Sequence, residues 1–241
     1  SFYNNPALFL DYEPGSVFKA FTMAAALDTD AVGPQTTYVD EGRVQIGSHT
    51  IKNSDNKSYG EQTMTQVLEQ SLNTGAIFAM REVGQQAFKS YVERFGFGEP
   101  AGIDLQSEVG GDIRALDEKN AIYFATASFG QGITVTTLQL ASAIAAIANE
   151  GKLMQPHVVF AVREEDGTVR EVRPEIKRQV ISERTSKLLS AMLASVVERG
   201  HGKRAGVPGY YIAGKTGTAQ IPKKDGPGYE PGAHIGSFIG F

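Results

Sequence analysis

The chain has 241 residues, a formal net charge of −4, 41% hydrophobic and 21% charged residues, and no cysteine. This composition is typical of a folded protein that buries a sizeable core. It offers no basic footprint for nucleic acid, no run of about 18 apolar residues that could span a membrane, and no thiol for catalysis, disulfide bonds or metal binding.

The first predicted helix covers residues 16–27. Pro14 and Gly15 precede it and block its backward extension, and an apolar stripe at helical spacing follows, formed by Phe18, Phe21 and Ala25. The next segment, residues 29–60, is polar and contains several glycines, so we expect loops and weak strands there.

Three more helices are predicted in the following part of the chain. The first begins at Thr63-Met-Thr-Gln66, which has the spacing of a capping box, and should end near Ser71. The second starts just after Asn73. The third covers residues 85–95 and is closed by Gly96.

A second capping box, Thr136-Thr-Leu-Gln139, opens a helix predicted over residues 138–149. Its apolar residues lie nearly all round the helix, so we expect it at the centre of the domain. Asp166-Gly167 stands between the extended runs 158–162 and 168–172, and this pattern predicts a β-hairpin.

The C-terminal part combines an amphipathic helix, residues 182–198, with two predicted strands, 210–219 and 234–241. This mixed order predicts an α+β fold in which helices flank a largely antiparallel sheet. Both ends look cut, because residue 1 opens without a leader and the last residues form an apolar strand-like run. We therefore expect a domain that is truncated at both ends.

Lys215-Thr-Gly-Thr218 has two incompatible interpretations. Residues 209–216 match the phosphate-loop pattern G-x-x-x-x-G-K-[ST]. Lys215-Thr-Gly217 also matches the third element of the serine acyltransferase set S-x-x-K, S-x-N and K-T-G. A phosphate loop needs a strand before it and a helix that opens at its Lys-Thr. The polar, breaker-rich flanks at 199–208 and 217–228 favour the acyltransferase.

Ser16-Val-Phe-Lys19 is the candidate nucleophile motif. Residues three apart share a helix face, so the amine can reach the hydroxyl, and a neutral lysine can activate serine as its base. The helix N-terminus favours the developing alkoxide. Ser54-Asp-Asn-Lys57 also matches S-x-x-K, and it contains an S-D-N triplet. No apolar residue anchors the segment 52–58, so we interpret it as a solvated turn.

Ser71-Leu-Asn73 is the better candidate for the second motif, because it falls between two apolar-striped helices that can hold it rigidly over a cleft. The Asn73 side chain can accept a hydrogen bond from a lysine and donate to a substrate carbonyl, and Ser71 can relay a proton.

The third motif supplies the remaining groups. Gly217 lets a substrate backbone lie alongside the strand without a side chain between them. The hydroxyls of Thr216 and Thr218, beside the charge of Lys215, suit a substrate carboxylate.

The combined motifs resemble the transpeptidase domain of penicillin-binding proteins, and the resemblance covers essentially the whole chain, residues 1–241, as one domain. The ending, residues 234–241, resembles the monofunctional class B members. The segments that carry the resemblance are Tyr12-Glu-Pro-Gly-Ser-Val-Phe-Lys19, Ser71-Leu-Asn73, Phe129-Gly-Gln-Gly-Ile-Thr-Val-Thr-Thr-Leu-Gln-Leu-Ala141 and Ala213-Gly-Lys-Thr-Gly-Thr-Ala-Gln220.

The resemblance implies a peptidoglycan D,D-transpeptidase with the β-lactamase/transpeptidase-like fold. Ser16 would attack the D-Ala-D-Ala carbonyl of a stem peptide, with Lys19 as the base. Ser71 and Lys215 would pass the proton to the leaving D-alanine. Asn73 would hold the amide of the donor peptide.

The same resemblance assigns the backbone N–H groups of Ser16 and Thr218 to an oxyanion hole, and the hydroxyls of Thr216 and Thr218 to the terminal carboxylate. β-Lactams mimic D-Ala-D-Ala and would acylate Ser16 without prompt release. No metal or other cofactor is implied. The family works at the extracytoplasmic face of the bacterial membrane, held by an N-terminal helix, and other cell-wall synthesis proteins would bind through regions outside this chain.

Several alternatives stay open at this point. Serine–histidine chemistry is disfavoured, because the four histidines are scattered and no G-x-S-x-G or H-E-x-x-H motif is present. A D,D-carboxypeptidase would use water as acceptor. A serine β-lactamase would need a base for deacylation, and Glu108 looks like a turn element instead. A β-lactam sensor would bind the drug covalently and show no turnover.

Overall fold

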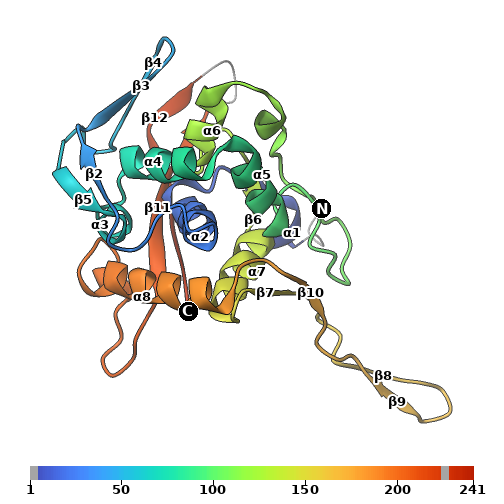
Figure 1. Cartoon of the computed structure of the whole chain (residues 1–241). Helices are drawn as coiled ribbons and strands as arrows, with labels where there is room; N and C mark the ends of the chain where they lie inside the picture. The colour runs from blue at the N-terminus through green and yellow to red at the C-terminus, as the bar shows by residue number, and fades with distance from the viewer. Residues whose placement is uncertain (1–4, 224–227) are drawn as a thin grey trace.

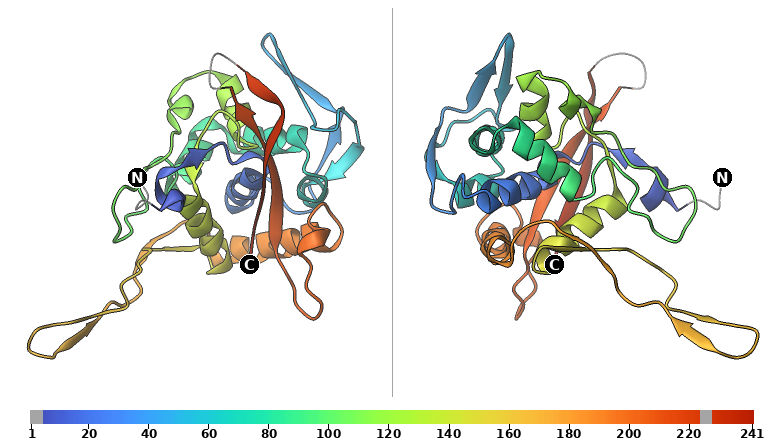
Figure 2. Two further views of the ribbon diagram at one scale, coloured as in Figure 1. Left: turned by 180° about the vertical axis from the view of Figure 1, so that it is seen from behind. Right: turned by 45° about the vertical axis from the view of Figure 1, so that its right-hand side comes forward.

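The computed structural model describes residues 5–223 and 228–241, except for the side chains at 219–222, 229 and 231. Helices surround a central helix, α2 (Lys19–Asp28), and antiparallel strand pairs lie around them (Figures 1 and 2). The expectation of a cut N-terminus rests on residues 1–4, which lie outside the described range. None of the helices in the described part of the chain is both long and apolar enough to cross a lipid bilayer.

The remaining helices are α1 (Pro6–Phe9), α3 (Met64–Gln70), α4 (Asn73–Val83), α5 (Gln85–Arg94), α6 (Ala121–Ala127), α7 (Thr137–Ala148) and α8 (Glu183–Glu198), with 3₁₀ turns η1 (Gly15–Phe18), η2 (Arg114–Asp117) and η3 (Lys203–Ala205). The described strands pair antiparallel as β1 (Asp11–Tyr12) with β6 (Val135–Thr136), β2 (Thr37–Asp40) with β5 (Gly60–Thr63), β3 (Arg43–Ile46) with β4 (His49–Lys52), β7 (Lys152–Met154) with β10 (Ile176–Gln179), β8 (Ala161–Arg163) with β9 (Val169–Glu171), and β11 (Gly214–Pro222) with β12 (Tyr229–Gly240).

The helix at the centre is α2, and the prediction that residues 138–149 occupy this place is wrong. Every residue from Lys19 to Leu27 is buried. By contrast, α7 buries one face and exposes Ala141 and Ala145 on the other. Alanine counts as apolar in a sequence pattern, but its small side chain costs little to expose. An all-round apolar pattern rich in alanine therefore does not establish central burial.

Helix boundaries agree closely with the sequence predictions. Both capping boxes form, at Thr63 with Gln66 and at Thr136 with Gln139. Helix α8 begins as predicted, with the Ser182 side chain accepting a hydrogen bond from the Thr185 amide. Helix α4 starts at Asn73 itself and not after it. The helix α6 and the pair β7–β10 had no counterpart in the sequence analysis.

The strand β11 starts later than predicted. Tyr210 and Tyr211 are 74% and 89% exposed and lie outside any strand, whereas β11 begins at Gly214. Exposed aromatic residues thus imitate a strand pattern in a surface loop. Lys215 and Thr216 lie within β11, with no helix opening at them, so the phosphate-loop interpretation is wrong.

Two hairpins project from the body of the molecule (Figure 2). The β8–β9 hairpin confirms the Asp166-Gly167 turn, with Gly167 at φ +86°, although its strands are shorter than predicted. The β3–β4 hairpin lies within the segment for which weak strands were predicted. The end of β4 leads directly into the candidate site.

Candidate active site

The turn η1 brings Ser16 and Lys19 together. Gly15 has φ +60°, and its amide donates to the carbonyl of Gly130 at 3.0 Å. A 3₁₀ turn eclipses side chains three residues apart, so Lys19 Nζ lies 3.0 Å from Ser16 Oγ. The sequence predicted an α-helix from Ser16. The structure has the 3₁₀ turn first, and α2 begins at Lys19.

Ser71 lies between two lysines. It follows the end of α3 in the left-handed conformation, with φ 58° and ψ 44°. Its Oγ is 3.2 Å from Lys19 Nζ and 2.9 Å from Lys215 Nζ. Lys19 also donates to the Ser71 carbonyl at 2.6 Å, and Lys215 donates to the Thr216 carbonyl at 3.0 Å. A continuous chain of polar atoms therefore connects Ser16 with Lys215.

Both lysines are removed from water. Lys19 is 1% exposed and Lys215 0% exposed, and neither forms an ion pair with a carboxylate in the described residues. Burial lowers the pKa of Lys215 to about 7. Burial, and secondly the charge of Lys215, hold the pKa of Lys19 well below its ordinary value. The second cause is the one that the sequence suggested; the larger cause required the structure.

The lowered pKa of Lys19 favours a neutral amine, and its three oxygen neighbours can accommodate that form. A neutral amine has two N–H donors and one lone pair, whereas an ammonium has three donors and no acceptor. The two N–H groups have acceptors in the Ser71 carbonyl and Ser71 Oγ. Ser16 Oγ is the third neighbour of Lys19 Nζ, at 3.0 Å, and in the neutral form the lone pair of the amine can accept the Ser16 proton. The amine is thus placed to receive a proton from Ser16.

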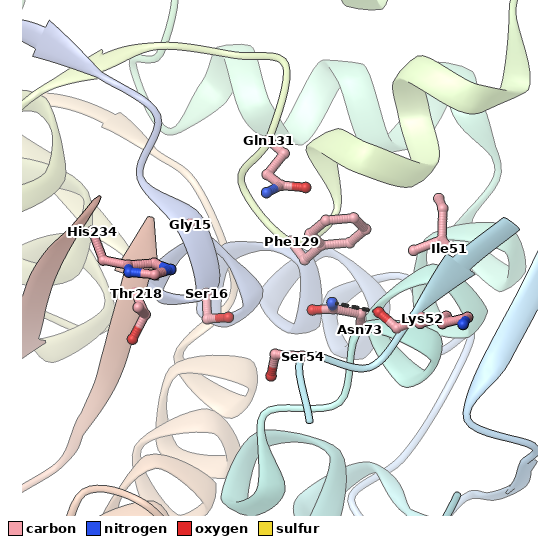
Figure 3. A pocket seen from close by; sticks show the side chains of 10 residues that line it. All are labelled: Gly15, Ser16, Ile51, Lys52, Ser54, Asn73, Phe129, Gln131, Thr218 and His234. Atoms are coloured by element: carbon pink, nitrogen blue, oxygen red, sulfur yellow. Dashed lines mark hydrogen bonds between the residues drawn. The ribbon is translucent and has the colours of Figure 1, made fainter. Parts of the chain in front are cut away.

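Asn73 is the first residue of α4 and faces the same cavity. Its Nδ2 donates to the carbonyl of Lys52 at 2.9 Å, and Oδ1 points toward Ser16 (Figure 3). The expected hydrogen bond from a catalytic lysine to Asn73 is not found in the described residues; a β4 carbonyl takes the amide group instead.

The strand β11 forms the opposite wall. Alternation along a strand puts Thr216 and Thr218 on one face and Lys215 and Gly217 on the other. A side chain on Gly217 would collide with Ser237 Oγ and come within 2.8 Å of Val17 Cγ1. The glycine at this position therefore lets the turn that carries Ser16 pack against β11, an effect that the sequence analysis had not assigned to it.

A cavity of about 330 Å³ joins these elements (Figure 3). Ser16, Asn73 and Thr218 line it, while Thr216 does not. Sequence reasoning missed several lining residues, which are Ile51, Lys52, Ser54, Phe129, Gln131 and His234. No Asp or Glu is among the described lining residues, and no group of three or more metal-binding side chains occurs in the described part of the chain.

Two of these omissions have identifiable causes. Ser54 was assigned to a solvated turn; it is exposed, but it also lines the cavity, and its neighbour Asn53 is only 3% exposed. His234 is positioned by strand register, because Gly236 lies opposite Thr218 and His234 is therefore diagonal to that threonine. Only the pairing of β11 with β12 could have revealed this.

Glu108 accepts hydrogen bonds from Ala101 and Gly102, which confirms its interpretation as a turn element.

A family model described as the penicillin-binding protein transpeptidase domain matches residues 2–241. The chain belongs to this family. It is 39% identical over its whole length to stage V sporulation protein D of Bacillus subtilis, of which it covers 38%, and 33% identical to a probable peptidoglycan D,D-transpeptidase PbpC of Pseudomonas aeruginosa, of which it covers 40%.

Solved structures of the transpeptidase family agree with the fold. The chain matches penicillin-binding protein 3 of Mycobacterium tuberculosis complexed with aztreonam, with a TM-score of 0.92 and 31% identity over 98% of this chain and 55% of the other. A complex of the same protein with ampicillin matches with the same TM-score. The chain thus spans about two fifths of the curated relatives and just over half of these solved chains.

Proposed function

We propose that residues 1–241 form one transpeptidase unit that acts as a peptidoglycan D,D-transpeptidase acylated at Ser16. The observation that carries this proposal is the path from Ser16 Oγ through Lys19 Nζ and Ser71 Oγ to Lys215 Nζ, whose three steps measure 3.0, 3.2 and 2.9 Å. It supplies a nucleophile, a neutral base and a proton donor for the leaving group at one side of a cavity.

Acylation begins when Ser16 Oγ attacks the carbonyl between the two terminal D-alanines of a stem peptide, and its proton passes to Lys19. The backbone N–H groups of Ser16 and Thr218 stabilise the oxyanion, an interaction often worth about 3 kcal/mol per donor. As the C–N bond breaks, the Ser71 hydroxyl gives its proton to the leaving D-alanine nitrogen. Ser71 is reprotonated by Lys19, with Lys215 holding the bridging oxygen.

The remaining residues hold the substrate. The Asn73 amide binds the backbone amide of the donor peptide, and Thr216 and Thr218 receive the terminal carboxylate, with Thr218 at the cavity. An amine from a neighbouring peptide then attacks the acyl-enzyme, and Ser16 regains a proton. No step requires a metal or other cofactor.

β-Lactams occupy the same site and leave Ser16 acylated. The aztreonam and ampicillin complexes of the M. tuberculosis relative support this part of the proposal. The described lining residues also support slow release, because none of them is a carboxylate that could activate water in the manner of a deacylation base. For the full-length protein we place the domain at the extracytoplasmic face of the membrane, held by an N-terminal helix, with other cell-wall synthesis proteins as partners.

Mass spectrometry after treatment with a fluorescent penicillin tests the nucleophile. We expect one adduct on the peptide that contains Ser16 and none in Ser16→Ala. An adduct on the Ser16→Ala protein would refute the mechanism. Incubation with a D-Ala-D-Ala donor peptide and an amine then separates the alternatives: a cross-linked product supports the transpeptidase, hydrolysis alone a carboxypeptidase, and a stable adduct without turnover a sensor.

A further inference from the structure

Asn53 holds the first turn of α4 from outside that helix. A helix start leaves its first N–H groups without partners, and the residue before the helix usually supplies an acceptor. Here that residue is Leu72, whose side chain has no such atom. The acceptor is Asn53 Oδ1, which receives the amides of Asn73 at 2.9 Å and Thr74 at 3.3 Å.

A buried carboxylate fixes the orientation of Asn53. Asp40 is 1% exposed, and Asn53 Nδ2 donates to its two oxygens at 3.1 and 2.9 Å. The same Nδ2 group donates to the carbonyl of Lys57 at 3.2 Å. An amide whose nitrogen side is committed to acceptors must present its oxygen to the helix. Asp40 thereby determines which atom of Asn53 meets Asn73.

Further hydrogen bonds complete this network. Asp40 also accepts from the amides of Gly42 and Tyr59, and from the Thr74 hydroxyl at 2.7 Å. The Tyr38 hydroxyl lies 3.0 Å from Thr74 Oγ1. Because the Thr74 O–H donates its hydrogen bond to Asp40, the Tyr38 O–H can donate to Thr74 Oγ1. Apart from Asn53, the donors to this carboxylate come from the turn after β2, from the residue before β5 and from α4, and the network is rigid because each of these groups is paired.

The end of β4 therefore holds Asn73 at two points. Lys52 receives its side chain, and Asn53 receives its backbone amide. These consecutive residues leave the Asn73 oxygen directed into the cavity (Figure 3). Asn73 sits at the first position of a helix, where the backbone would otherwise fray, so its placement depends on partners outside α4.

We propose that Asn53, oriented by Asp40, is a positioning residue that sets the alignment of Asn73 with the amide group of the donor peptide. This inference rests on the proposed role of Asn73. It extends the functional set beyond the three motifs to a segment that resembles a solvated turn in sequence. Asn53 itself touches no substrate, since the cavity is lined by its neighbours Lys52 and Ser54.

Two β-lactams separate alignment from general damage. Benzylpenicillin carries an acylamino side chain that Asn73 would bind, whereas 6-aminopenicillanic acid lacks the acyl group. For Asn53→Ala we expect the second-order acylation rate to fall about tenfold with benzylpenicillin, the scale of one or two lost hydrogen bonds, and to change less than about threefold with 6-aminopenicillanic acid. Asn53→Leu, which keeps the volume but removes the acceptor, should do the same.

The controls separate an error in the role of Asn73 from an error in the role of Asn53. Thr50→Ala removes a β4 side chain whose hydrogen bond within the described residues is to Gln45 of the same hairpin, and it should leave both rates unchanged. Asn73→Ala should lose the preference for benzylpenicillin, which is the ratio of its acylation rate to that of 6-aminopenicillanic acid. If it does not, the proposed role of Asn73 is wrong. If Asn73→Ala loses the preference and the Asn53 variants keep it, the positioning role is wrong.

The wild-type protein provides a measurement that needs no variant. Amide hydrogen exchange of Asn73 and Thr74 should be slowed at least about tenfold relative to Glu183 and Arg184 at the start of α8. There, among the described residues, the side chain of the cap, Ser182, accepts a hydrogen bond from a single amide, that of Thr185. Equal exchange at the two helix starts would overturn the claim that Asn53 holds this turn.

Discussion

The buried amine of Lys215 predicts a specific dependence of stability on pH. Its pKa falls from 10.5 in water to about 7 in the fold because burial disfavours the charged form. Between these values the unfolded chain binds a proton that the folded chain does not. The free energy of unfolding must therefore rise as the pH increases from 7 toward 10.

The magnitude follows from the same linkage. One proton bound by the unfolded chain alone is worth about 1.4 kcal/mol per pH unit, so Lys215 contributes about 3 kcal/mol between pH 7.5 and 9.5. Lys19 acts in the same direction, since its pKa is lowered too. We end the pH range at 9.5 because four tyrosines have raised pKa values, namely Tyr12, Tyr38, Tyr59 and Tyr91. Above pH 10 they make the free energy of unfolding fall as the pH increases.

The perturbation is Lys215→Met, which fills the space with an uncharged side chain. Urea unfolding followed by circular dichroism at pH 7.5, 8.5 and 9.5 measures the effect. From pH 7.5 to 9.5, we expect the free energy of unfolding of the wild type to increase by about 3 kcal/mol more than that of the variant. The exposed Lys119 provides the control Lys119→Met, which should run parallel to wild type. Parallel profiles for Lys215→Met as well would refute a buried, mostly neutral Lys215.

Three further predictions concern the cavity. Lys19→Arg places a permanent cation where a neutral base is required, so stopped-flow acylation by a fluorescent penicillin should slow by about 10²–10⁴-fold; a wild-type rate would contradict the role of Lys19. Gly217→Ala should destabilise the fold by about 1–3 kcal/mol and slow acylation, because the added methyl group meets Ser237 and Val17. The control is Gly236→Ala, where an added methyl group has nothing within 4 Å. It should change thermal stability by less than about 0.5 kcal/mol. His234→Ala should weaken the non-covalent step of β-lactam binding by about threefold to tenfold without altering the acylation step; an effect on acylation alone would place His234 in a different role.

Short-range signals accounted for most of the helices. The capping boxes at Thr63 and Thr136 act over three residues, and so does the spacing of Ser16 and Lys19. Such contacts are fixed by local geometry, so a sequence pattern is sufficient to predict them. The motif residues Ser16, Lys19, Ser71 and Lys215 indeed meet in one cluster.

Long-range contacts account for what could not be predicted. Asn53 caps a helix twenty residues away, and nothing in its neighbourhood of polar turn formers marks it as buried. His234 reaches the cavity through the register of β11 with β12. The exposed pair Tyr210 and Tyr211 shows the opposite failure, because a strand-like composition occurs in a loop that pairs with none of the described strands.

The conformation of Ser71 links fold and chemistry. A non-glycine residue with positive φ costs about 1–2 kcal/mol, and glycine is the usual residue at this place after a helix. Here the end of α3 is clamped: Glu69 accepts from the Ser195 hydroxyl, and Gly200 packs so closely that an added Cβ would lie 2.6 Å from the Glu69 carbonyl. The clamp holds the backbone turn, and both lysines bind the hydroxyl that the turn presents. A glycine would relieve the strain but remove the oxygen between the two amines. The proton path from Ser16 to Lys215 therefore requires a serine at this strained position.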